Sequence, residues 1–172
     1  TKNTKVITVT SADDSKTYDG SKLPNAGYTY TQGILVEGDV LTATVAGTIT
    51  DSGTAANKVT GYTVMRGTAD VTDYYTFGKS VDGTLTVNKR KVTLTSADDS
   101  KTYDGDPLTN STFTVGGDGW AKNEGASYHV TGSQLDAGSS SNTFDADEPY
   151  TLNSSTKAAN YDITTHEGTL EV

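Results

Sequence analysis

The sequence has little of what most catalytic and metal-binding domains use. It contains no cysteine, one tryptophan and two histidines among 172 residues. Without cysteine there is neither a disulfide framework nor a zinc–thiolate site, and the two histidines lie in no cluster with ligand spacing. The longest apolar run is only a few residues, which is too short to span a membrane.

Basic charge is also scarce. The 13 lysines and arginines are outnumbered by 22 acidic residues, so the formal net charge is −9. Binding to nucleic acid requires basic patches, and adsorption to anionic membrane surfaces is also driven by basic residues. We therefore expect no nucleic-acid partner and no membrane insertion of this chain.

The chain repeats itself from end to end. The decapeptide Ser-Ala-Asp-Asp-Ser-Lys-Thr-Tyr-Asp-Gly occurs at residues 11–20 and again at residues 96–105. The Gly-Thr-Leu-Thr-Val segment at residues 83–87 returns as Gly-Thr-Leu-Glu-Val at residues 168–172. At the same offset, four central positions return as the same residue types: Gly47, Asp51, Gly53 and Asn57 as Gly132, Asp136, Gly138 and Asn142. This pattern predicts two modules, residues 5–88 and 90–172, within a longer tandem array.

Strand patterns dominate both modules. Apolar residues alternate with threonine or other polar residues in pairs of segments at equivalent places: 7–10 with 92–95, 28–30 with 113–115, 43–45 with 128–130, and 85–87 with 170–172. This period of two indicates half-buried strands, and frequent Asp-Gly turns favour an antiparallel arrangement. Residues 58–72 and 143–159 differ between the modules and are predicted to be exposed loops. One helical turn is expected at residues 121–125.

The order of these motifs resembles a known repeat family. Lys-Thr-Tyr-Asp-Gly followed by leucine, then Gly-x-x-x-Asp-x-Gly-x-x-x-Asn, then Gly-Thr-Leu-x-Val occur in both modules. They are similar to the YDG and MBG ("mostly β-grasp") tandem repeats of adhesin-like surface proteins of Gram-positive and gut bacteria. The resemblance implies a mostly-β fold of two β-grasp-like antiparallel modules arranged end to end. It implies no catalytic residues.

The function expected from this resemblance is structural. The chain would be a stalk spacer of a bacterial cell-surface protein, anchored to the cell wall, that projects a distal binding domain. Its partners would be neighbouring modules of the same chain, and it would be an extracellular monomer. The alternative is a binding module that itself recognises a host glycan or protein. Neither reading makes the chain an enzyme, and neither assigns catalytic, cofactor-binding or metal-binding residues.

Three groups of polar residues are candidates for metal binding, crosslinking or ion pairing. The repeated aspartates, Asp13 and Asp14 with their counterparts, are predicted to form solvated turns, with a Ca²⁺ site as the alternative. Lys91 with Asn160, and Lys5 with Asp73, are the conceivable isopeptide pairs, although solvent exposure of both lysines is expected. The basic residues 89–91 are expected to pair with carboxylates.

The remaining candidate residues for packing or binding are aromatic and histidine side chains. Tyr18 and Tyr103, which occupy the same place in the two decapeptides, are both predicted to be buried and to anchor their turns. Trp120, which replaces Leu35 of the first module, is predicted to pack in the core or at an edge and not to bind a sugar. His129 and His166 are expected to face the surface.

Overall fold

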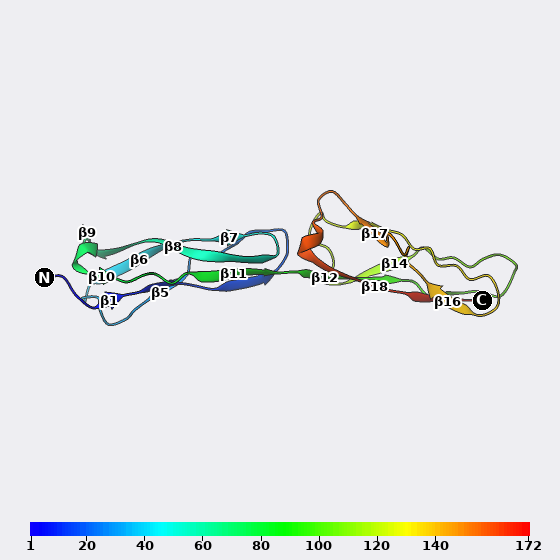
Figure 1. Cartoon of the computed structure of the whole chain (residues 1–172), viewed down its shortest axis with the longest axis horizontal. Coiled ribbons are helices and arrows are strands. Elements are labelled where there is room, and N and C mark those ends of the chain that lie inside the picture. Colours follow the sequence, from blue (N-terminus) through cyan, green and yellow to red (C-terminus); the bar gives the residue numbers. More distant parts are fainter. The chain divides into compact units, whose positions relative to one another are not determined.

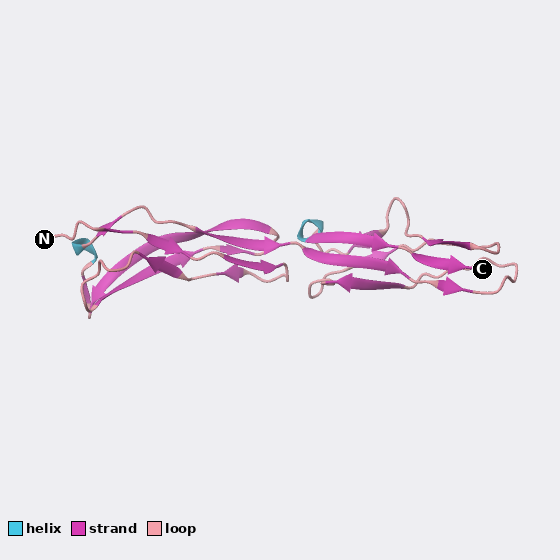
Figure 2. Ribbon diagram, turned by 90° about the horizontal axis from the view of Figure 1, so that it is seen from below, coloured by secondary structure: helices cyan, strands magenta, loops and turns pink.

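Strands form almost all of the regular structure. The computed structural model describes all residues, 1–172, and Figure 2 shows strands joined by turns throughout. The helical segments are two single 3₁₀ turns, η1 (Thr72–Tyr74) and η2 (Ala158–Asn160). The predicted mostly-β class is therefore confirmed. No helix is long and apolar enough to cross a membrane.

The chain divides into two compact units. Unit 1 comprises Thr1–Thr17 and Ser21–Asn88, and unit 2 comprises Lys89–Val172 together with the tripeptide Tyr18–Gly20. The tripeptide belongs to the first decapeptide, which the sequence repeat places in the first module, yet the structure groups it with unit 2.

Unit 1 contains a long central sheet with smaller strand pairs beside it (Figure 1). The central sheet has the order β3-β11-β8-β6, with β9 paired to β8, and the small pairs are β1-β10, β2-β5 and β4-β7. The strands of this unit are β1 (Val6–Ile7), β2 (Val9–Ser11), β3 (Asp14–Thr17), β4 (Leu23–Pro24), β5 (Tyr28–Tyr30), β6 (Asp39–Ala46), β7 (Thr48–Ile49), β8 (Gly53–Arg66), β9 (Ala69–Asp70), β10 (Thr76–Phe77) and β11 (Gly83–Asn88).

Unit 2 contains two three-stranded sheets and one strand pair. The sheet orders are β14-β12-β18 and β13-β19-β16, and β15 pairs with β17. The strands are β12 (Arg90–Ser96), β13 (Asp99–Ser100), β14 (Phe113–Gly117), β15 (Ala126–Tyr128), β16 (Ser139–Asn142), β17 (Tyr150–Leu152), β18 (Tyr161–His166) and β19 (Gly168–Glu171).

The sheets are mixed, so the prediction of purely antiparallel modules is wrong. β3 runs parallel to β11, with Asp14 opposite Leu85, and β13 runs parallel to β19, with Asp99 opposite Leu170. The register is the same in both units. Parallel neighbours need a crossover connection, and the strands between the decapeptide and the last strand of each repeat supply it. Local alternation in the sequence indicates strands but not their direction.

The cores lie only partly where the period of two placed them, because Val64, Val71 and Phe144 are buried within segments that were predicted to be exposed loops. In unit 1 the core consists of Ile7, Val9, Leu41, Val64, Val71 and Tyr75. The buried apolar residues of unit 2 include Val92, Leu94, Leu108, Phe144, Tyr161 and Leu170. Thr8 and Thr93, between the buried residues of β1, β2 and β12, are partly exposed. Alternate residues of a strand point to opposite faces, so one face of each strand supplies the core.

Two predictions about irregular segments need correction. Residues 58–66 are not a loop, because they belong to β8, the longest strand of unit 1. β8 pairs with β6 along one edge and with β11 along the other, and Val64 within it is fully buried. The predicted helical turn at residues 121–125 is not helical, because Asn123 has a φ of 65°; the segment is a single turn closed by the hydrogen bond from the Glu124 N–H to the Ala121 carbonyl at 3.0 Å.

Candidate functional site

A buried polar network ties the first decapeptide to the rest of unit 1. The Ser11 hydroxyl donates to the Asn57 carbonyl and accepts from the Gly83 N–H at 2.8 Å. The Asn57 side-chain amide donates to the carbonyls of Ala12 and Asn25 at 2.9 and 3.0 Å. Asn57 has no solvent exposure, so these bonds replace the water that its amide has lost.

The same network recurs in unit 2. The Ser96 hydroxyl donates to the Asn142 carbonyl and accepts from the Gly168 N–H at 2.9 Å. The Asn142 amide donates to the carbonyls of Ala97 and Asn110, both at 2.9 Å. The duplicated serine and asparagine are therefore structural residues, whose hydrogen bonds connect segments far apart in each repeat.

Two duplicated glycines are required beside this network. A Cβ atom on Gly47 would lie 2.6 Å from the Asn57 Oδ1, and one on Gly132 would lie 2.4 Å from the Asn142 Oδ1. Both distances are below any normal contact. The two buried Oδ1 atoms have no other hydrogen-bond partner, so each faces a glycine Cα–H, a weak donor. The repeated spacing of glycine and asparagine thus has a packing cause.

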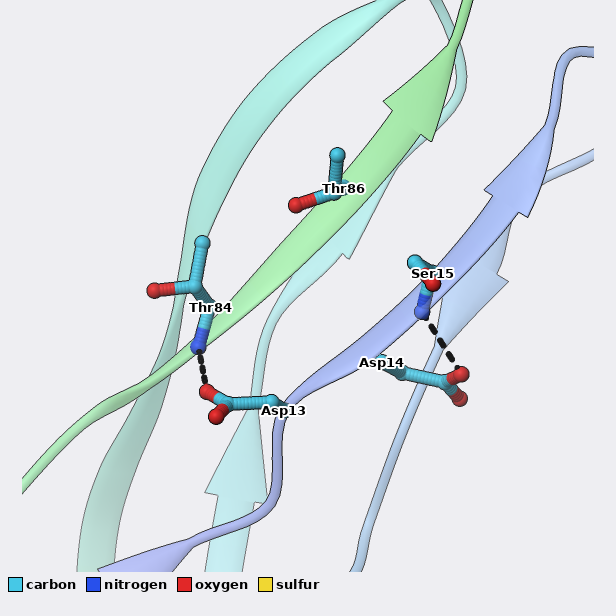
Figure 3. Close-up of a pocket in the computed structure, with 5 residues that line it drawn as sticks. All are labelled: Asp13, Asp14, Ser15, Thr84 and Thr86. Carbon is cyan, nitrogen blue, oxygen red and sulfur yellow. Dashed lines mark hydrogen bonds between the residues drawn. The ribbon is translucent and has the colours of Figure 1, made fainter.

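The paired aspartates hold strand ends together. Figure 3 shows the Asp13 carboxylate directed at Thr84, whose N–H it accepts at 2.7 Å. The Asp14 carboxylate accepts from the Ser15 N–H at 2.8 Å and from the Asn25 amide at 2.9 Å. The two side chains serve different partners and do not converge on one point. Asp14 is the first residue of β3 and pairs with Leu85, so the prediction of a solvated turn at these aspartates is wrong.

Asp98 and Asp99 repeat these contacts in unit 2. Asp98 accepts from the Thr169 N–H at 2.7 Å, and Asp99 accepts from the Ser100 N–H and the Asn110 amide. Nowhere in the chain do three or more acidic, histidine or cysteine side chains gather as metal ligands would. The Asp-rich segments accept hydrogen bonds from the backbone and from asparagine side chains.

The most unusual cluster surrounds Tyr18 in unit 2. The Tyr18 hydroxyl donates to the Glu124 Oε1 at 2.6 Å, and the Tyr161 hydroxyl donates to the Glu124 Oε2 at 2.7 Å. The rings of Tyr18 and Tyr161 meet edge to face, with centroids 5.6 Å apart. Tyr18 is only 4% exposed. We call Glu124, Tyr161 and Trp120 the tyrosine contact site.

Neighbouring groups fix this site. The Trp120 ring packs against Tyr161 with centroids 4.9 Å apart, and its indole N–H donates to the Tyr128 hydroxyl at 2.6 Å. The Arg90 guanidinium donates to the Tyr18 carbonyl at 3.2 Å and to the carbonyls of the adjoining turn, including Gly119 at 2.7 Å. One cation therefore links the tripeptide to the turn that precedes Trp120.

Unit 1 has an equivalent arrangement with a different partner. The Val36 N–H donates to the Tyr75 hydroxyl at 2.9 Å, as the Ala121 N–H does to the Tyr161 hydroxyl at 3.1 Å. The Tyr75 hydroxyl donates to Asp39 as Tyr161 does to Glu124. No second tyrosine hydroxyl contacts Asp39.

The second partner of Asp39 is an arginine. Asp39 holds Arg66 in a two-point ion pair, with the guanidinium Nε and Nη2 at 2.6 and 2.9 Å from the carboxylate oxygens. Arg66 therefore takes the role in unit 1 that Tyr18 has in unit 2.

A pocket lies beside this ion pair. It has a volume of about 270 Å³ and is lined by Thr1, Asn3, Val36, Arg66, Tyr74 and Tyr75. Val36 is 53% exposed and Tyr74 is 60% exposed, whereas Ala121, the counterpart of Val36, is buried. The unit 1 pocket is thus an open, partly aromatic surface at the place that Tyr18 covers in unit 2.

Burial and hydrogen bonds shift the acidity of both clusters. Burial raises the pKa of Tyr161 to about 12, and the hydrogen bond to the Glu124 carboxylate acts in the same direction. In unit 1 the hydrogen bonds from Arg66 and Tyr75 lower the pKa of Asp39 below its usual range. Tyr161 therefore stays protonated and Asp39 stays ionised at neutral pH.

The structure separates the two decapeptide tyrosines. Tyr18 is buried as predicted, but Tyr103 is 58% exposed, so the prediction for Tyr103 is wrong. Its turn is formed in the same way, since Gly20 and Gly105 both adopt the left-handed region with φ of 80° and 90°. Tyr103 is exposed because no other segment of the chain packs over its ring.

Other side chains lie largely as expected. Trp120 is half-buried within an aromatic cluster, which confirms its packing role. His166 is exposed, while His129 is half-buried with its Nε2 3.1 Å from the Thr151 hydroxyl. Lys5 and Lys91 are exposed as predicted, and Asn160 is fully buried.

The residues at the join have partly different partners from those predicted. Lys89 pairs with the Asp162 carboxylate at 3.4 Å, whereas Arg90 binds backbone carbonyls. Sequence reasoning missed Arg90, Glu124 and Tyr161 as one cluster. The only available signal was the tyrosine of the decapeptide, because the partners are dispersed along the chain.

Comparisons with known proteins supply no relative. No protein-family model matches the chain, and neither a curated protein nor a solved structure is significantly similar to it. The arguments about function therefore depend on the geometry alone. That geometry consists of the duplicated serine and asparagine networks and the clusters around Tyr161 and Tyr75.

Proposed function

We propose that the chain is a structural spacer from the stalk of a bacterial cell-surface adhesin-like protein, of the YDG/MBG repeat type. Its two β-grasp-like modules would be arranged end to end, outside the cell, and would project a distal binding domain from the cell wall. The chain would act as a monomeric segment without catalytic activity.

One observation supports this proposal above the others. The features that the two repeats share are scaffold features: the buried Ser11 and Asn57 network, its Ser96 and Asn142 copy, and the backbone contacts of the paired aspartates. Repeats that reproduce their internal supports suit a spacer, whose role is to hold length. The repeats also reproduce one surface pocket, which is lined by Asp13, Asp14, Ser15, Thr84 and Thr86 in unit 1 and by Asp98, Asp99, Ser100, Thr169 and Glu171 in unit 2.

The short join gives the proposal a geometric basis. Only residues 89–91 separate β11 from the buried Val92, and Arg90 and Lys91 already belong to β12. An extended chain covers about 3.3–3.6 Å per residue, so a join of three residues spans only about 10 Å. A stalk gains length from such a join when successive modules continue in one direction.

Small-angle scattering of the chain tests this function. Compact packing of 172 residues would give a radius of gyration of roughly 16 Å, whereas two modules of roughly 12 Å each placed in line give roughly 20 Å. The spacer proposal expects the larger value, unchanged between low and high salt. A radius near the compact value would refute it.

A binding module remains the second candidate because of the unit 1 pocket. Tyr74 and Arg66 are exposed there, and such groups can stack on a sugar or a peptide. A glycan array probed with the chain, and with a Tyr74→Ala variant as the matched control, tests this reading. Binding of a glycan that Tyr74→Ala abolishes would favour the binding module over the spacer.

A further inference from the structure

The Tyr18-Asp19-Gly20 turn lies where the last strand of the first repeat ends. β3 runs parallel to β11 with Thr17 opposite Asn88, so the residues that follow these two leave the sheet at the same end. Tyr18 follows Thr17 directly, and Arg90 is two residues beyond Asn88. The Arg90 guanidinium donates to the Tyr18 carbonyl at 3.2 Å. The parallel register thus places the turn beside the segment that begins the second repeat.

The turn of the second repeat has the same place. β13 runs parallel to β19 with Ser100 opposite Glu171, and the Lys101 N–H donates to the Glu171 carbonyl at 3.0 Å. The Tyr103-Asp104-Gly105 turn follows directly, at the end of the sheet where β19 leads to Val172. A repeat that continued from Val172 would therefore start beside this turn.

The two turns differ in what covers them. The Tyr18 hydroxyl donates to Glu124, and a Cβ atom on Gly20 would lie 3.8 Å from the Glu124 Oε1, so the whole turn faces this carboxylate. A Cβ atom on Gly105 would meet no atom within 4 Å, and the Tyr103 ring is exposed. The second turn therefore has the shape of the first without the groups that bury it.

We propose that the Tyr103-Asp104-Gly105 turn is the docking element for a following repeat that carries its own tyrosine contact site. Counterparts of Glu124 and Tyr161 in that repeat would bury the Tyr103 ring, and a counterpart of Arg90 would bind the Tyr103 carbonyl. The proposal rests on the proposed function, because it requires that spacer repeats follow one another. Each unit of the array would then be completed by the turn of the repeat before it.

The chemistry of the contact is aromatic and not ionic. Asp104 already pairs with Lys101 within the turn, at 2.6 Å, so its carboxylate is not the group that a partner would bind. The exposed group is the phenol of Tyr103, whose identical counterpart uses a carboxylate acceptor and the edge of a second tyrosine ring. Because a following repeat is covalently linked and starts beside the turn, its effective concentration is high and one aromatic contact suffices.

Nitration by tetranitromethane of an extended chain tests the docking. The full chain is continued after Val172 by a second copy of residues 88–172, and that copy carries Tyr103→Phe so that only the inner Tyr103 is counted. Mass spectrometry of the peptides gives the rate at each tyrosine. Nitration of Tyr103 is expected to fall roughly tenfold relative to the unextended chain, since a buried ring reacts only through local opening. Tyr74, which is exposed in unit 1, should react equally in both chains.

The matched control is an extended chain whose added copy also carries Glu124→Ala. Tyr103 should then react nearly as fast as in the unextended chain, and the amide spectrum verifies that the added copy is folded. Glu124→Gln, which replaces one acceptor oxygen by an amide donor, serves as a milder variant if the alanine variant does not fold.

Two results would overturn the proposal. The first is a Tyr103 that reacts equally fast with and without the added copy. The second is protection of Tyr103 that persists when the added copy lacks its Glu124 carboxylate, because the site would then not be its cause. Scattering of the unextended chain tests the spacer function separately. A reactive Tyr103 in a chain with the dimensions of two modules in line would therefore refute the docking alone.

Discussion

The two decapeptides have one sequence and two environments. Residues 11–20 and 96–105 are identical, and they make the same local contacts: Asp13 and Asp98 accept equivalent backbone N–H groups, and Gly20 and Gly105 adopt the same conformation. Yet Tyr18 is 4% exposed and Tyr103 is 58% exposed. Local sequence therefore fixes the shape of the turn, while the burial of its side chain depends on whether another segment covers it.

The largest expected difference between the two copies concerns their tyrosines. Tyr18→Ala removes a buried ring and leaves Glu124 with one fewer donor, so it should destabilise unit 2 by about 3–5 kcal/mol. Tyr103→Ala should change stability by less than about 0.5 kcal/mol, because the ring is exposed. Denaturant unfolding followed by Trp120 fluorescence measures unit 2 directly, since Trp120 is the only tryptophan. Equal losses would contradict the assigned environments.

The buried asparagines should behave alike in both units. Asn57→Ala and Asn142→Ala each leave two carbonyls without their side-chain donor, at a cost of about 2–4 kcal/mol. Urea unfolding followed by amide resonances of each unit separates the two effects. Asn88→Ala, at an exposed position, is the matched control and should cost less than about 0.5 kcal/mol. A large effect in only one unit would show that the two networks are not equivalent.

Alkaline pH should weaken unit 2 through Tyr161. Its pKa is about 12 in the folded chain and about 10 in an unfolded one, so the folded state holds the proton more tightly. Stability should therefore be fully retained below pH of about 10 and should fall as pH rises toward about 12. Absorbance of the phenolate reports the titration, and Tyr161→Phe should remove the late step. A Tyr161 that ionises with the exposed tyrosines would disprove its burial by this cluster.

Acid should produce a smaller effect, which in unit 1 acts through Asp39. The pKa of Asp39 is lowered by the hydrogen bonds from Arg66 and Tyr75, so its contribution to stability is present above the unfolded pKa of about 3.9. That contribution is lost as pH falls through the lower folded value. Carbon-detected NMR of the carboxyl group measures the titration, with Asp39→Asn as the reference for stability. An Asp39 that titrates in the ordinary range would be inconsistent with the ion pair.

Much of the fold could be predicted from particular residues. The alternation around Val92 and Leu94 correctly indicated a half-buried strand, and the segments around Leu85 and Leu170 were correctly predicted to be strands. The direction of pairing could not be predicted, because parallel and antiparallel strands share a period of two. Residues 58–66 were mistaken for a loop because divergence between repeats is also compatible with a long paired strand.

The sequence by itself determined the repeat, the mostly-β class and the turns, since these depend on periodicity, glycine conformation and contacts within a few residues. It also marked Ser11, Asn57 and their copies by repetition, although not their hydrogen bonds. Only the tertiary structure decided which tyrosine is buried and which carboxylate it meets. Tyr18 and Glu124 are 106 residues apart, and the pairing of Asp39 with Arg66 rather than a second tyrosine depends on side chains brought together by the sheets. Burial is a property of what surrounds a residue, and identical decapeptides can therefore have different environments.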